Sequence, residues 1–159
     1  MLFRSGVFAL DAATGARLWA NEKAIGVTDL VLWSEPPHAP TQGGPLSGGP
    51  LVPAFKMLLA SSGTSGLWAF EPGSGRMVWR VPVPEGGITA PVPVAGAILV
   101  GSTRYGLFLM SPRNGKVIDG IDLGSGFAQT PAAWGDRAYA MTNQGTLLGI
   151  QVESPLRRP

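Results

Sequence analysis

Few of the side chains that usually perform catalysis are present in this sequence. His38 is the only histidine, it stands among prolines, and there is no cysteine. A metal site of histidines and cysteines, or a nucleophile with a histidine base, therefore lacks its partners. The segment 63–66 departs from the Gly-x-Ser-x-Gly elbow, and the glycine pairs at 43–44 and 48–49 lack the Lys-Ser/Thr of a phosphate loop. The residues predict no catalytic, cofactor-binding or metal-binding site.

Side chains that could contact a partner protein are easier to identify. Trp33 ends the apolar segment 27–33, which could be a strand leading into a Pro- and Gly-rich loop, and His38 lies in that loop. Arg104 and Tyr105 occupy a connection between predicted strands, and both residue types are common anchors of protein interfaces. Long loops often carry binding function. The alternatives are local packing for Trp33, a solvated loop for His38, and an ordinary polar turn for Arg104 and Tyr105.

The composition narrows the class of protein. Of 159 residues, 45% are hydrophobic and only 14% are charged, with 23 glycines and 15 prolines, which is typical of many short strands separated by turns. The net charge of +2, with scattered lysines and arginines, argues against nucleic-acid binding. The longest apolar stretch, residues 92–101, is about half of what a membrane span needs. The opening residues of the sequence as given do not resemble a secretory signal, and the lack of cysteine leaves the redox compartment open.

A repeat with a period of about forty residues runs through the chain. The segment 6–19 is matched position by position by 66–79 and again by 106–119, and 146–152 begins a fourth copy. About twenty extra residues follow the first copy. Each full unit reads as four short strands, and Ile98-Leu-Val100 is continuously apolar. Such a strand must be covered on both faces, as it is when sheets stack as the blades of a propeller.

The third and fourth strands of each unit are joined by a turn with its own chemistry. Asp11 is expected to accept local backbone hydrogen bonds where the first turn starts. Gly15, Gly75 and Gly115 are expected to supply the positive φ that closes the turns.

The pattern Ala-x-Asp-x-x-Thr-Gly-x-x-x-Trp, complete from Ala9 through Asp11 and Gly15 to Trp19, resembles the tryptophan-docking motif of pyrroloquinoline-quinone-like β-propeller repeats. In that family the indole packs against the turn of a neighbouring blade, so the resemblance implies structural roles, with Gly15 and Trp19 as such a pair. The second copy keeps Ala69, Gly75 and Trp79 and has Glu71 in place of the aspartate. The third copy keeps Gly115 but has Asp119 in place of the tryptophan. The third interface is therefore expected to be weaker.

We predict an all-β fold, a β-propeller of four-stranded antiparallel blades. About four blades are present, two complete and two partial, as an incomplete ring in a single domain of residues 1–159. The expected parts are a partial blade at 1–19, an inserted loop or hairpin at 20–49, blades at 50–80 and 90–120, a partial blade at 127–152 and a tail at 153–159.

The resemblance extends to members without catalysis, such as the propeller lipoprotein of the outer-membrane barrel-assembly machinery. It implies a non-catalytic interaction scaffold of the bacterial cell envelope, in the periplasm, with protein partners bound through the blade loops and no cofactor. The alternatives are a fragment of a quinone-dependent dehydrogenase, which would use pyrroloquinoline quinone and calcium, and a ligand-sensing domain of a larger receptor. Because family propellers have more blades, we expect either a piece of a longer protein or a homodimer that completes the ring.

Overall fold

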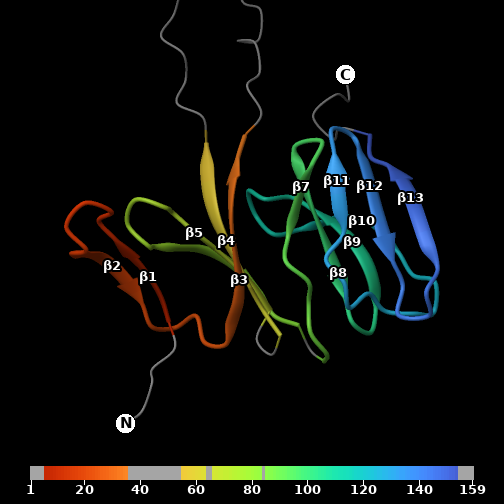
Figure 1. Ribbon diagram of the computed structural model, residues 1–159, viewed down its shortest axis with the longest axis horizontal. Coiled ribbons are helices and arrows are strands. Elements are labelled where there is room, and N and C mark those ends of the chain that lie inside the picture. Colours follow the sequence, from red (N-terminus) through yellow and green to blue (C-terminus); the bar gives the residue numbers. More distant parts are fainter. Residues whose placement is uncertain (1–5, 36–54, 64–65, 84, 154–159) are drawn as a thin grey trace, which may run out of the picture.

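The structure is a computed structural model that describes residues 6–35, 55–63, 66–83 and 85–153. Its regular elements are strands, arranged in four antiparallel sheets that follow one another along the chain. Figure 1 shows the sheets side by side in sequence order, from β1 and β2 at one end to β13 at the other. The prediction of an all-β propeller arc, with two four-stranded blades between two partial ones, is confirmed.

Each blade follows the repeat, and equivalent strands occupy equivalent places. The first blade holds only the third and fourth strand positions of the repeat, and the last blade holds the first three. The strands are β1 (Val7–Leu10) and β2 (Arg17–Asn21); β3 (Val27–Ser34), β4 (Lys56–Ser62), β5 (Gly66–Phe70) and β6 (Met77–Val81); β7 (Val92–Val94), β8 (Ala97–Ser102), β9 (Gly106–Met110) and β10 (Val117–Ile121); and β11 (Ala132–Trp134), β12 (Arg137–Met141) and β13 (Leu147–Gln151).

The first strand of the second blade lies earlier in the chain than the predicted blade start at residue 50. The expected start of that blade at residue 50 lies outside the described residues, and β3 takes the first position by pairing with β4 along its whole length, from Val27 opposite Ser62 to Ser34 opposite Lys56. Residues 27–34 therefore belong to the blade rather than to an insertion at 20–49. The extra residues separate the first two strands of the second blade instead of separating two blades.

The four blades meet at three interfaces, here called seams. At two of these seams a tryptophan of the preceding blade packs on the following blade. The indole nitrogen of Trp19 donates a hydrogen bond to the carbonyl of Pro72, at 2.9 Å, and that of Trp79 donates to Pro112, at 2.8 Å. Each ring lies over the glycine of the same turn: a Cβ on Gly75 would meet Trp19 at 2.3 Å, and a Cβ on Gly115 would meet Trp79 at 2.7 Å. A side chain at either glycine would displace the indole.

The expected pairing of Gly15 with Trp19 is wrong, because each indole packs on the following blade. Nothing lies within 4 Å of a Cβ on Gly15. The third seam has no indole, since Asp119 takes the tryptophan position and accepts a hydrogen bond from the amide of Gly120. The apolar cluster between the third and fourth blades includes Phe127, which is fully buried.

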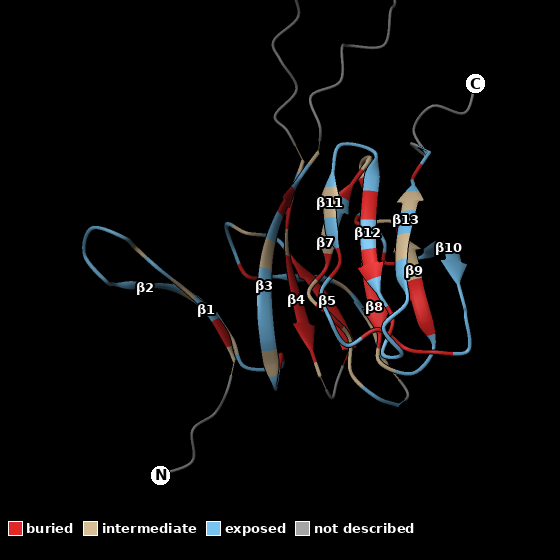
Figure 2. Ribbon diagram, turned by 45° about the vertical axis from the view of Figure 1, so that its right-hand side comes forward, coloured by how far each residue is buried: buried red, intermediate tan, exposed pale blue. Residues whose placement is uncertain are grey.

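The apolar core lies between the sheets, in one cluster for each pair of neighbouring blades. Figure 2 shows the buried residues concentrated on the middle strands of the arc. All residues of β8 are buried, as expected for a strand covered on both faces. Among the described residues the first and last blades each pack against one other blade, and they expose far more of their side chains than the two blades between them.

Candidate functional site

The turn between β8 and β9 at the tip of the third blade is held from both sides by neighbouring segments. On one side, Thr103 donates its amide to the carbonyl of Gly87, at 3.0 Å, and its hydroxyl oxygen accepts from the amide of Gly87, at 2.8 Å. On the other side, the side-chain amide of Asn143 in the fourth blade donates to the carbonyl of Thr103, at 3.2 Å. The backbone of this tip is therefore fixed before any partner arrives.

Arg104 and Tyr105 project from this fixed turn. The hydroxyl of Ser102 accepts hydrogen bonds from the amides of both residues, at 3.3 and 3.1 Å. The guanidinium of Arg104 forms an ion pair with Glu85, in which both side chains are more than half exposed, and Tyr105 is 43% exposed. The tip thus presents a cation, an anion and a phenol to solvent, a combination that suits hydrogen bonding and stacking with another protein. Sequence reasoning identified both residues, but not Glu85.

The other two predicted partner residues do not join this surface. Trp33 is 2% exposed and belongs to the core between the second and third blades, so its proposed role as a surface contact is wrong. The alternating pattern of β3 turns its ring inward, and the ring packs edge-on against Phe55 with centroids 6.1 Å apart. His38 lies outside the described residues.

A second cluster, missed by sequence reasoning, ties the second blade to the third. Arg113, in the turn between β9 and β10, forms an ion pair with Glu35 at the end of β3. Its guanidinium also lies 4.9 Å from the ring centroid of Phe55. The side chain of Glu35 is only 10% exposed, so this pair is better shielded from solvent than the pair at the tip. The two partners are 78 positions apart, and no local pattern signals such a contact.

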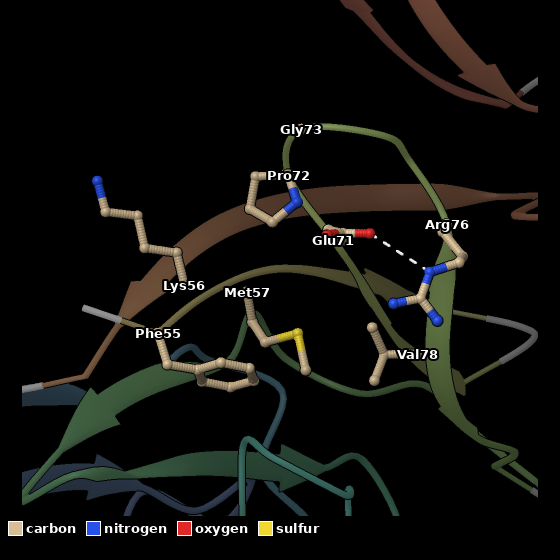
Figure 3. A pocket seen from close by; sticks show the side chains of 8 residues that line it. All are labelled: Phe55, Lys56, Met57, Glu71, Pro72, Gly73, Arg76 and Val78. Atoms are coloured by element: carbon tan, nitrogen blue, oxygen red, sulfur yellow. Dashed lines mark hydrogen bonds and ion pairs between the residues drawn. The ribbon is translucent and has the colours of Figure 1, made fainter. Parts of the chain in front are cut away.

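An open pocket of about 450 Å³ lies at the other end of the second blade, beside the turn between β5 and β6. Figure 3 shows Phe55, Met57 and Val78 as its apolar lining, with the ion pair of Glu71 and Arg76 at the rim. In both blades the third strand, β5 or β9, runs from the tip end to the end with the turn before the fourth strand. The pocket and the Arg104 tip are therefore at opposite ends of the blades.

The acidic residues at the motif position accept hydrogen bonds within their own turns. The hydroxyl of Thr14 is the main cause of a lowered pKa at Asp11, helped by the amides of Thr14 and Ala13. The pKa of Glu71 is lowered chiefly by the hydroxyl of Ser74 and then by Arg76. Among the described residues no three His, Cys, Asp or Glu side chains are grouped so that they could hold a metal ion.

The lowered pKa of Glu71 predicts a pH-dependent contribution to stability. A carboxyl whose folded pKa lies below its ordinary value of 4.5 stabilises the fold above that value, and the contribution is lost as the pH falls through the folded pKa. We expect Glu71→Gln to be less stable than the unmodified protein at neutral pH, by a small amount because the group is exposed. Urea midpoints should converge on acidification, and a constant difference would contradict the prediction.

Within the described part of the chain, no helix has the length and apolar character needed to cross a membrane. The sequence model of the family described as outer membrane protein assembly factor BamB matches residues 4–154. The curated outer membrane protein assembly factor BamB of Legionella pneumophila (strain Paris) is 29% identical over 87 residues, which are 54% of this chain and 23% of that protein.

Solved structures share the fold, and two of them illustrate it. BamB from Moraxella catarrhalis superposes with a TM-score of 0.63 and 19% identity, covering 94% of this chain and 41% of that chain. The computationally designed Ika4 protein superposes with a TM-score of 0.64 and 12% identity, covering 93% of this chain and 80% of that chain. The chain therefore spans less than half the length of either BamB protein.

Proposed function

Since the chain belongs to the family of the outer membrane protein assembly factor BamB, we propose that it is a non-catalytic interaction scaffold in the assembly of outer-membrane proteins. Its place would be the cell envelope, on the periplasmic side where such proteins are assembled, and its partners would be proteins. The proposal includes no quinone and no calcium ion. In support, the carboxylates of the motif positions Asp11 and Glu71 are engaged in hydrogen bonds within their own turns.

The observation that carries the proposal is the fixed tip between β8 and β9. A partner that binds Arg104 and Tyr105 orders little backbone, because Thr103 is already hydrogen bonded to segments on both sides. Preorganised anchors lose less conformational entropy on binding than anchors on a mobile loop. Arginine and tyrosine are also among the residues that most often dominate the energy of an interface.

The experiment is a binding titration against the purified outer-membrane protein assembly machinery. We expect the double variant Arg104→Ala with Tyr105→Ala to bind at least about tenfold more weakly, equivalent to roughly 1.4 kcal/mol. The matched control is Arg76→Ala, which removes an arginine from another exposed ion pair, that with Glu71, at the opposite end of the blades. This control should bind like the unmodified protein.

Two results would count against the proposal. If the tip variant binds as tightly as the Arg76→Ala control, the tip is not the partner surface. If the unmodified protein does not bind the machinery at all, the scaffold role itself is wrong. Circular dichroism of each variant checks that the fold is intact, which we expect because neither altered side chain at the tip is buried.

A further inference from the structure

The pocket on the second blade has an apolar floor that belongs to the packed interior between two blades. Met57 is part of the core cluster between the second and third blades, and Phe55 packs against that cluster. Val78 of β6 adds a third apolar side chain, which is 42% exposed. Ligand pockets in proteins are mostly apolar, with a few polar groups that fix the orientation of the ligand. This floor therefore favours an aromatic or aliphatic group.

The charges around the pocket leave one cation without a partner. Figure 3 shows Lys56 on one side of the pocket and Arg76 on the other, with Glu71 paired to Arg76. All ten acidic residues of the chain lie in the described part. Among the described residues none of these acids forms an ion pair with Lys56. Because Arg76 balances Glu71, the side chain of Lys56 gives the pocket a net positive charge beside the apolar floor.

The turn that borders the pocket has a glycine where the other copies of the repeat have a side chain. Gly73 corresponds to Ala13 in the first blade and to Arg113 in the third. The φ of Gly73 is outside the left-handed region, and a Cβ there would meet nothing within 4 Å, so the backbone does not require glycine. In the third blade the side chain at this position reaches back to the second blade, with the guanidinium 4.9 Å from the ring centroid of Phe55. Glycine at position 73 keeps the pocket open on the side of its own turn.

We propose that this pocket binds a peptide segment in which an aromatic residue stands next to an acidic residue. The aromatic ring would pack on Phe55, and the flexible thioether of Met57 would adapt to its shape. The neighbouring carboxylate would bind the ammonium group of Lys56. Because the pocket is open, the peptide backbone can continue along the surface on both sides. This inference does not rest on the proposed function, since the Arg104 tip is at the opposite end of the blades.

The test follows the methyl group of Met57 by nuclear magnetic resonance in the full chain with carbon-13 methyl-labelled methionine. The probe is the peptide Gly-Phe-Asp-Gly with both ends blocked, so that its one carboxylate is that of the aspartate. We expect the Met57 signal to shift and saturate as peptide is added, while the signal of Met141 in the fourth blade stays in place. A peptide with lysine instead of aspartate should bind about fivefold more weakly, as expected for the loss of one exposed ion pair.

Reversal of the charge in the pocket separates this site from general adhesion. Lys56→Glu should bind the aspartate peptide about fivefold more weakly and should bind the lysine peptide better than the unmodified protein does. The matched control is Lys23→Glu, which reverses another exposed lysine, beyond the end of β2 and at the opposite end of the blades. This control should bind both peptides as the unmodified protein does.

A variant of Gly73 tests the shape of the pocket independently of its charge. Gly73→Leu should reduce the Met57 shift at equal concentrations of either peptide, whereas Ala13→Leu, the same change in the equivalent turn of the first blade, should not. Three results would overturn the proposal. These are a Met57 signal that does not respond to the aspartate peptide, equal weakening by Lys56→Glu and Lys23→Glu, and a response to octanoate without a response to the peptide, which would indicate a lipid instead.

Discussion

Replacement of Trp79 by alanine should lower the free energy of unfolding by about 3 kcal/mol, the lower end of the range for large aromatic side chains because the ring is only partly buried. The substitution removes the indole from Gly115 and from the core cluster of the second and third blades. It also removes the hydrogen bond to the carbonyl of Pro112. Urea unfolding followed by far-ultraviolet circular dichroism measures the change without relying on tryptophan fluorescence.

The control for this prediction is another tryptophan of the same chain. Trp134 is 87% exposed at the end of β11, so Trp134→Ala should change the free energy of unfolding by less than about 0.5 kcal/mol. The two variants lose the same side chain from different environments. Similar unfolding midpoints for both would show that the seam between the blades does not depend on the docked indole.

The second large effect is expected at Gly75, where the cost of a single methyl group depends on the neighbouring blade. Gly15 and Gly75 have nearly the same φ, 70° and 68°, and close equivalent turns. Both Gly15→Ala and Gly75→Ala therefore carry the cost of about 1–2 kcal/mol for an alanine in the left-handed region. Only at Gly75 does the new Cβ meet the Trp19 ring, at 2.3 Å, which adds about 1–3 kcal/mol of overpacking.

Comparing the two glycine variants isolates the contact between blades from the backbone strain that they share. The measurement is the difference between their urea midpoints. In a Trp19→Ala background the extra cost of Gly75→Ala should disappear, since the coupling energy of contacting residues is what a double-mutant cycle reports. Equal destabilisation by Gly15→Ala and Gly75→Ala in the unmodified background would contradict the docking of Trp19 on Gly75.

Much of the fold could be predicted from the sequence because each blade repeats the same local chemistry. The turns with Asp11 or Glu71 at the start and a glycine of positive φ at the end are set by residues four positions apart. The direction of docking could not be predicted in this way. Gly15 and Trp19 lie in one motif, but stacking brings Trp19 to Gly75, and a single copy of the motif carries no information about its neighbour.

The first strand of the second blade was misplaced for a related reason. Pro50 stands at about the same offset before its repeat copy as Pro91 and Pro131 do, which favoured a strand after residue 50. The structure places β3 there instead, and its pairing with β4 across an intervening segment is a long-range contact without a periodic signal. The same applies to the candidate site, where Arg104 and Tyr105 were visible as an exposed turn, but their neighbour Glu85 was not.

The docking of each indole on the following blade bears on how such chains can evolve. The seam from Trp19 to Gly75 and the seam from Trp79 to Gly115 use the same donor, the same carbonyl acceptor position and the same glycine. A deletion in frame with the repeat, which removed the second blade, would bring Trp19 to Gly115 and rebuild an equivalent seam. Blades that carry this tryptophan and glycine can therefore be exchanged or deleted by recombination without loss of the interface. The interface between the third and fourth blades lacks the indole and would not be rebuilt in this way.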